Sequence, residues 1–180
     1  MNKIYFISGA SGVGKTTVMK ELKKTLPEEQ FDIHDFDERG VPDNAGHDWR
    51  IEETKYWINL GDAIAKEGKS LVVCGLSNPD EMLEFSKEIN TPVETILLDA
   101  KPEIIENRLR SRNQDEHIRK DLERAAGPVE EFTKNNTNFA IMLRKICDSH
   151  GCRVIDTSEI LPEIVAERVA ESIKDIKIKS

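Results

Sequence analysis

The segment Gly9–Thr16, with the sequence GASGVGKT, constrains the fold of this chain more than any other feature. Its three glycines permit backbone turns that other residues avoid, so successive N–H groups can converge on one anion. The apolar run Ile4–Ile7 precedes the segment, and a helical pattern follows it and ends before Pro27. A strand, a glycine-rich loop and a helix in this order predict a phosphate-binding loop, or P-loop.

Each part of the P-loop has an expected contact with a nucleotide. Lys15 would reach the β- and γ-phosphates, and the Thr16 hydroxyl would ligate Mg²⁺. We therefore expect ATP as the phosphate donor, with GTP as an open alternative, and Mg²⁺ as the cofactor. The residues predicted to bind the nucleotide here are Gly9, Ser11, Gly12, Val13, Gly14, Lys15, Thr16 and Thr17.

Length and composition predict a globular domain. The chain has 180 residues, of which 38% are hydrophobic, and none of its apolar runs approaches the roughly 20 residues that span a bilayer. Its three cysteines lack C-x-x-C spacing, which is typical of reduced thiols in the cytoplasm. A net charge of −8 argues against nucleic acid as the main partner. We expect a cytoplasmic monomer or homodimer that binds neither nucleic acid nor a membrane.

Expected strands alternate with expected helices along the whole chain, which predicts an α/β fold with a parallel sheet. The expected strands lie at residues 3–8, 31–37, 70–74, 93–98 and 153–155. The expected helices begin near residues 15, 48, 79, 102, 128 and 162; the third ends near residue 90 and the last near residue 176. Turn formers, Asp43 and Asn44 among them, follow the second strand. We expect one domain over residues 1–180, with a mobile segment at about 110–127.

Two carboxylates, Asp35 and Asp37, end the expected second strand. Because residues i and i+2 of a strand point to the same side, both could face a cleft at the carboxyl edge of the sheet. One would hold Mg²⁺ through water, and the other would accept a proton from an attacking hydroxyl. The alternative is that both are solvated loop acids in a chain with 34 Asp and Glu residues.

Basic residues follow the expected fourth strand. Arg108 and Arg112 are four residues apart and share one face of a helix, as a clamp on transferring phosphates requires. The alternative is a solvated helix with local ion pairs. Arg39 and Arg50 lie near the second helix, where they could bind an anionic acceptor or be ordinary solvated side chains.

The segment Ile155–Ser158 ends the last strand. Its edge of the sheet is where a nucleotide base would lie beside the P-loop, which makes Thr157 and Ser158 candidate contacts. An ordinary strand-to-helix turn, with the two hydroxyls as local caps, explains the same residues equally well.

Four motifs in this order, Gly9–Thr16, Asp35–Asp37, Asn107–Arg112 and Ile155–Ser158, resemble those of P-loop small-molecule and nucleoside monophosphate kinases, with shikimate and gluconate kinases nearest. The resemblance covers nearly the whole chain. It implies a three-layer P-loop NTPase fold with a five-stranded parallel sheet, order 2-3-1-4-5, and a helical lid after the fourth strand.

The same resemblance implies roles for single residues. Arg108 or Arg112 would contact phosphates, and the adenine would pack near Thr157 and Ser158. Asp35 would lie near magnesium and Asp37 near the acceptor.

The chain departs from these families at two points. The third strand ends Val73-Cys74-Gly75, so it lacks the usual Walker B acid, and Asp99 after the fourth strand is expected to be structural. The lid segment also lacks the Asp-x-x-Arg-Pro signature of shikimate kinases, which argues against shikimate as the acceptor.

We therefore predict an ATP-dependent phosphotransferase that moves the γ-phosphoryl group to a small-molecule acceptor, at a hydroxyl. The alternatives are a nucleoside monophosphate kinase and a regulatory ATPase without kinase activity. The predicted catalytic residues are Lys15, Asp37, Arg108 and Arg112, the acceptor residues Asp37, Arg39 and Arg50, and the metal ligands Thr16 and Asp35.

Overall fold

The computed structural model describes residues 1–42 and 45–175, so the predicted turn residues Asp43 and Asn44 and the predicted helix end at residue 176 lie outside it. Within these ranges, parallel strands form one five-stranded sheet in the order β2-β3-β1-β4-β5. The predicted α/β class and strand order are confirmed. The strands are β1 (Ile4–Ser8), β2 (Phe31–Asp35), β3 (Ser70–Cys74), β4 (Val93–Asp99) and β5 (Arg153–Asp156).

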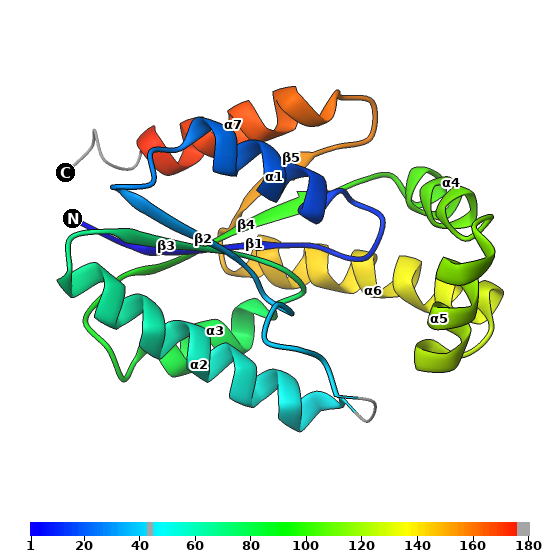
Figure 1. Cartoon of the computed structure of the whole chain (residues 1–180), viewed down its shortest axis with the longest axis horizontal. Helices are drawn as coiled ribbons and strands as arrows, with labels where there is room; N and C mark the ends of the chain where they lie inside the picture. The colour runs from blue at the N-terminus through cyan, green and yellow to red at the C-terminus, as the bar shows by residue number, and fades with distance from the viewer. Residues whose placement is uncertain (43–44, 176–180) are drawn as a thin grey trace.

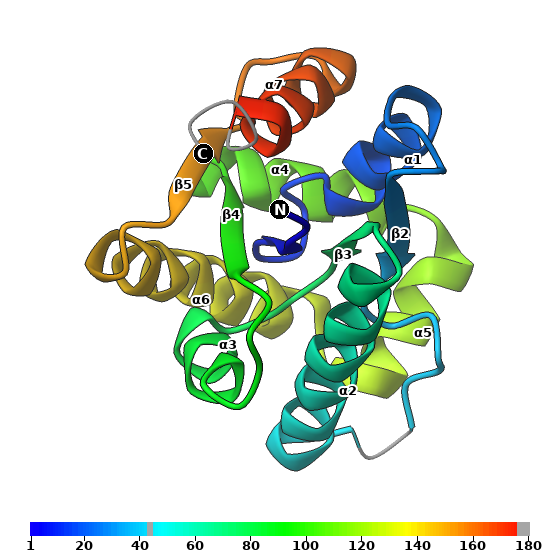
Figure 2. The same cartoon turned by 90° about the vertical axis from the view of Figure 1, so that its left-hand side faces the viewer.

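Helices cover both faces of the sheet, which makes three layers (Figure 1). Helices α1 and α7 lie on one face, and α2, α3 and α6 lie on the other (Figure 2). The helices are α1 (Lys15–Thr25), α2 (His47–Lys66), α3 (Pro79–Ser86), α4 (Pro102–Arg112), α5 (Glu116–Ala126), α6 (Val129–Ser149) and α7 (Pro162–Asp175).

Strand β1 is the centre of the sheet and is buried along its whole length. It pairs with β3 on one side and β4 on the other. Its side chains alternate between two cores: Tyr5 and Ile7 pack with α1 and α7, while Ile4 and Phe6 pack with α2. Because β1 is packed on both faces and on both edges, the loop that follows it starts from a fixed point.

The structure corrects three of the predicted element boundaries. Strand β2 ends at Asp35, two residues before the predicted end, because the chain turns at Phe36. Helix α3 ends at Ser86, since the next amides bond to carbonyls three residues earlier, in a tighter turn. The basic stretch forms two helices, because the Asp115 carboxylate accepts from the N–H groups of His117 and Ile118 and caps a new helix.

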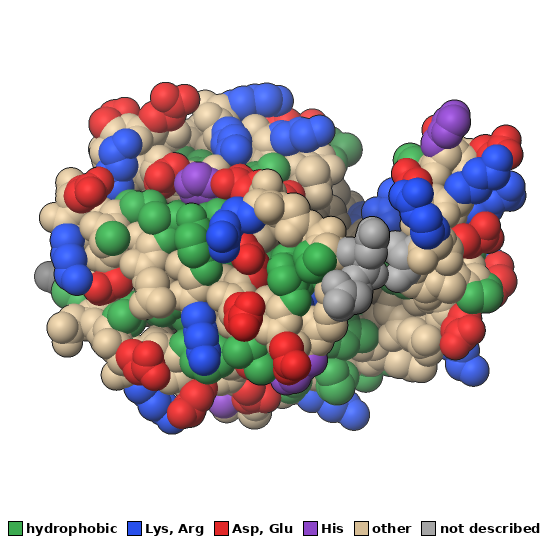
Figure 3. Space-filling model, turned by 60° about the horizontal axis from the view of Figure 1, so that its bottom comes forward, with side chains coloured by type: hydrophobic (Ala, Val, Ile, Leu, Met, Phe, Trp, Pro, Cys, Tyr) green, Lys and Arg blue, Asp and Glu red, His purple; other side chains and the backbone are tan. Residues whose placement is uncertain are grey.

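Helix α5 and the start of α6 form a lobe that projects from the main body beyond α4 (Figure 1). A notch separates this lobe from the rest of the molecule in the space-filling view (Figure 3). The lobe coincides with most of the segment predicted as the lid. In the ranges described, no helix combines the length and the apolar character that crossing a membrane requires.

Candidate active site

The P-loop connects β1 to α1 and turns sharply at its glycines. Gly12 and Gly14 have φ angles of 89° and 103°, in the region that residues with a Cβ rarely adopt. Helix α1 begins at Lys15, as predicted, and no described side chain caps its N-terminus. The first N–H groups of a helix have no intrahelical acceptor, so this end of α1 is a site for an anion.

Lys15 is held back against the loop that precedes it. Its Nζ atom donates to the carbonyl oxygens of Gly9 at 2.8 Å and Ala10 at 2.9 Å. Burial lowers the pKa of Lys15 to about 8, and the nearby carboxylates of Asp37 and Asp35 only partly offset this effect. The ammonium group is therefore desolvated, and a phosphate anion would stabilise its charged form.

The carboxylates of Asp35 and Asp37 both line the cavity that contains the P-loop. The strand geometry predicted for the pair is wrong, because Asp37 lies in the turn beyond β2. A hydrogen bond within this turn instead holds the two residues together, because the Asp37 N–H donates to Asp35 Oδ1 at 2.9 Å. Between them, Phe36 donates its N–H to the Cys74 carbonyl at 2.9 Å and accepts from Trp57 Nε1 at 3.1 Å.

Asp37 faces Arg50 across the same part of the cavity. Arg50 Nη1 lies 3.9 Å from Asp37 Oδ1 and donates to the carbonyl of Leu76 at 3.2 Å. Burial raises the pKa of Asp37, while the Arg50 guanidinium lowers it, and the Asp35 carboxylate raises it. Asp37 therefore has an increased affinity for a proton. This property suits a residue that accepts a proton from a substrate.

Arg39, the other predicted acceptor residue, does not line this cavity. Its Nη1 atom lies 3.2 Å from Glu53 Oε2, and its guanidinium carbon lies 3.6 Å from the centre of the Tyr56 ring. The buried Glu53 carboxylate and the aromatic ring together hold Arg39 on the surface of α2.

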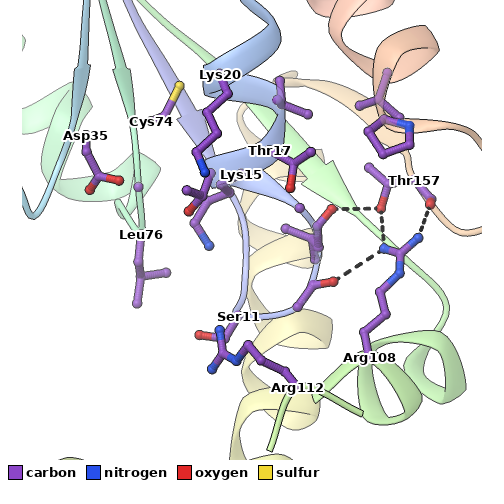
Figure 4. Close-up of a pocket in the computed structure, with 18 of the residues that line it drawn as sticks. Ser11, Lys15, Thr17, Lys20, Asp35, Cys74, Leu76, Arg108, Arg112 and Thr157 are labelled. Carbon is purple, nitrogen blue, oxygen red and sulfur yellow. Dashed lines mark hydrogen bonds between the residues drawn. The ribbon is translucent and has the colours of Figure 1, made fainter. Parts of the chain in front are cut away.

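Arg108 joins the P-loop to the end of β5 (Figure 4). Its guanidinium donates to the Gly12 carbonyl at 3.3 Å, to Thr157 Oγ1 at 3.1 Å and to the Thr157 carbonyl at 2.6 Å. Thr157 in turn donates its hydroxyl to the Val13 carbonyl at 3.0 Å. Arg108 therefore fixes two walls of the cavity relative to each other.

Ser158 does not line the cavity, in contrast to Thr157. Its hydroxyl donates to Asp156 Oδ1 at 2.6 Å and accepts from the Lys101 N–H at 2.9 Å. The bond to Asp156 is that of a local turn, which is the alternative that the sequence left open. The bond from Lys101 joins this turn to the residue before α4.

Arg112 lines the cavity beside Ser11 (Figure 4). Its neighbour Arg110 points elsewhere and pairs with Glu130 at the start of α6. The two arginines are two residues apart on α4, so they occupy different faces of the helix. Arg112 therefore lies on the face of α4 that borders the cavity, as Arg108 does, and Arg110 does not.

These residues surround a single open cavity of about 940 Å³. In Figure 4, Asp35 and Leu76 lie on one side of Lys15, and Thr17 and Thr157 lie on the other. Ile118 from α5 also contributes to the lining, so the projecting lobe borders the cavity. The cavity lies at the carboxyl edge of the parallel sheet, where α/β proteins of this kind bind ligands.

Comparisons with known proteins identify the family of this chain. The sequence profile of a protein family described as an AAA domain matches residues 6–131. The chain belongs to this family. A comparison with curated protein sequences found no match.

Solved structures similar to this AAA-domain protein include several kinases. A shikimate kinase from Acinetobacter baumannii, in complex with shikimate, has a TM-score of 0.61 at 17% identity, covering 99% of this chain and 97% of that chain. An APS kinase from Mycobacterium tuberculosis, in complex with AMPPNP and APS, has a TM-score of 0.60 at 12% identity, covering 96% and 98%. A protein designated APE1195 has a TM-score of 0.67 at 16% identity, covering 97% and 96%. The predicted P-loop kinase fold is confirmed.

The AAA-domain protein has the donors that Mg²⁺ uses beside a nucleotide. Among the described residues, no group of three or more His, Cys, Asp or Glu side chains could hold a metal alone. Mg²⁺ instead keeps several waters and binds through one or two carboxylates together with substrate phosphates. The Thr16 hydroxyl and the Asp35 carboxylate both line the cavity and fit this mode.

Some cavity residues are not among those predicted from the sequence. Lys20 had a usable signal, because it lies one helical turn after Thr16 and so shares its face of α1. Leu76 follows the carboxyl end of β3, where sites in such sheets lie. Cys74 and Gly75 stand at the same end of that strand. The remaining ones carry no local signal; they are Val18, Leu109, Ile118, Ile160, Pro162 and Val165.

The lowered pKa of Lys15 predicts how nucleotide binding depends on pH. Lys15 is charged below about pH 8 and loses its proton above it, so affinity for ADP should fall as the pH rises from 7.5 to 9.5. Isothermal titration calorimetry at fixed ionic strength measures this. Lys15→Gln should bind weakly with no such decline, whereas wild-type affinity that is constant up to pH 9.5 would contradict the assignment.

Proposed function

We propose that this protein transfers the γ-phosphoryl group of ATP to a hydroxyl of a small molecule in the cytoplasm, with Mg²⁺ as cofactor. The observation that carries the proposal is that one cavity is lined both by the P-loop with Lys15 and by Asp35 and Asp37. A γ-phosphate bound at the loop would then lie between the Lys15 ammonium group, whose pKa is lowered, and the Asp37 carboxylate, whose pKa is raised. Phosphoryl transfer needs such positioning and charge stabilisation more than covalent chemistry.

On the nucleotide side, Lys15 would exchange its two carbonyl partners for the β- and γ-phosphates. Thr16 and Asp35 would hold Mg²⁺, which neutralises charge on the phosphates. Arg112 would stabilise charge on the transferred group, since its guanidinium borders the P-loop. Arg108 would keep Thr157 in place beside the base rather than contact phosphate directly, because its bonds go to the protein backbone and Thr157.

On the acceptor side, Asp37 would orient the hydroxyl and accept its proton. Arg50 would bind the acceptor and lower the pKa of Asp37. Binding an acceptor phosphate, as a nucleoside monophosphate kinase does, would require further cationic side chains at this position. Arg39 does not supply one, because its guanidinium pairs with Glu53 and packs on the Tyr56 ring. This contrast favours a hydroxyl acceptor.

We further propose that residues 110–127 act as a lid within a single domain over residues 1–180. Ile118 already borders the cavity, so an inward movement of α5 would cover the reacting groups. Excluding water in this way would favour transfer to the acceptor over hydrolysis of ATP.

The proposal is tested by ATP consumption with Mg²⁺ against pooled hydroxyl-bearing metabolites, followed by mass spectrometry of the product. A phosphorylated product is expected, and Asp37→Asn should reduce its formation by about 10²–10⁴-fold because the proton acceptor is lost. Asp148→Asn, the same chemical change at an exposed carboxylate of α6 outside the cavity, is the matched control and should retain most activity.

Two results would contradict the proposal. ATP turnover that no acceptor raises above background, with a stoichiometric protein partner recovered from a pull-down, would favour a regulatory ATPase. Phosphorylation of nucleoside monophosphates in preference to hydroxyl compounds would favour a nucleoside monophosphate kinase.

The contact between Arg50 and Asp37 predicts the pH dependence of catalysis. The Arg50 guanidinium lowers the pKa of Asp37, so Arg50→Gln should raise that pKa and move the acid limb of kcat/KM to higher pH. A pH–rate profile measures the shift once an acceptor is known. Arg39→Gln should leave the acid limb in place, because Arg39 lies outside the cavity; an identical shift in both variants would contradict the assignment.

A further inference from the structure

Asn136 of α6 makes two hydrogen bonds to one residue of the P-loop, 125 positions earlier in the chain. Its Oδ1 atom accepts from the Ser11 N–H at 2.9 Å, and its Nδ2 atom donates to the Ser11 carbonyl at 2.9 Å. The residue is 9% exposed. Asparagine is a poor helix former, and a buried amide needs partners, so these two bonds account for its place inside the helix.

The two bonds fix two successive peptide planes. The Ser11 N–H belongs to the peptide between Ala10 and Ser11, whereas the Ser11 carbonyl belongs to the peptide between Ser11 and Gly12. In a trans peptide the C=O and the N–H point in opposite directions. Because Asn136 holds the Ser11 carbonyl toward α6, the Gly12 N–H is turned away from α6.

The direction of the Gly12 N–H matters because Gly12 lines the cavity. Gly12 has φ 89° and no side chain, so the peptide before it is free to flip unless another group holds it. A flipped peptide would present the Ser11 carbonyl oxygen, a negative partial charge, where an N–H should meet a phosphate. The Ser11 N–H itself is occupied by Asn136.

Helix α6 also supports the elements around the lobe. It packs against α4, which carries Arg108 and Arg112, and against α5, which contributes Ile118. Figure 4 shows α6 passing behind the loop at Ser11. Helix α6 therefore contacts the P-loop and also packs against the two helices, α4 and α5, whose side chains line the cavity.

We propose that Asn136 is a positioning residue that holds the Gly12 N–H toward the β-phosphate of the bound nucleotide. The inference rests on the proposed function in so far as it requires that the P-loop binds a nucleotide. Asn136 does not line the cavity and would act through the Ser11–Gly12 peptide. Removing its amide lets the peptide flip, and the apparent affinity falls with the fraction of molecules whose loop is competent to bind.

The test compares binding of ADP with binding of adenosine, which lacks the phosphates. Asn136→Ala removes both bonds, and Asn136→Leu removes them while keeping the volume of the side chain. Both variants should bind ADP about tenfold or more weakly in calorimetry, while adenosine affinity stays within about threefold of wild type. The midpoint of thermal unfolding without ligand checks that each variant is folded.

Asn138→Ala is the matched control, because Asn138 is exposed on the same helix and undergoes the same chemical change. It should bind ADP as wild type does. ADP affinity within threefold of wild type in both Asn136 variants, or an equal loss of ADP and adenosine binding, would overturn the proposal while leaving the proposed function intact. A folded wild-type protein that binds no ADP would instead contradict the proposed function, and the role of Asn136 with it.

Discussion

The unpaired N–H groups at the start of α1 are the constraint on which the site depends. Strand β1 is buried along its whole length and delivers the P-loop to a fixed position, and no described side chain caps the helix that follows. A helix end of this kind requires water or an anion as its partner. Lys15 lies at the same point, and burial lowers its pKa to about 8. An anion bound here would therefore also stabilise the charged form of Lys15.

The rest of the cavity is arranged around that anion site by contacts between distant elements. Arg108 ties the loop to Thr157, Asn136 ties it to α6, and Trp57 fixes the turn that carries the two carboxylates. Gly75 permits this last arrangement, because a Cβ there would lie 2.1 Å from the Cβ of Phe36. The opposing charges of Lys15 and the carboxylates are therefore held in place by groups that do not themselves react.

The features that the sequence predicts well are local ones. The P-loop and the presence of Asp35 and Asp37 in the cavity follow from local motifs. The strand order is not a local feature, and it was implied by the resemblance to P-loop kinases. Contacts between remote residues could not be predicted: the partners of Arg39 and of Asn136 lie on other segments and leave no pattern nearby. The break between α4 and α5 was visible in principle, since Asp115 is a helix-capping residue that precedes Glu116 in the first turn.

A crystal structure with Mg²⁺ and a non-hydrolysable ATP analogue would be the most direct measurement. The triphosphate should lie along residues 9–16, with Lys15 Nζ moved from the Gly9 and Ala10 carbonyls to the β- and γ-phosphates. The metal should contact Thr16 directly and Asp35 through water, with Asp37 facing the γ-phosphate across the space left for an acceptor. A nucleotide bound elsewhere, or a γ-phosphate that faces neither Lys15 nor Asp37, would contradict the assignment of this cavity as the site of phosphoryl transfer.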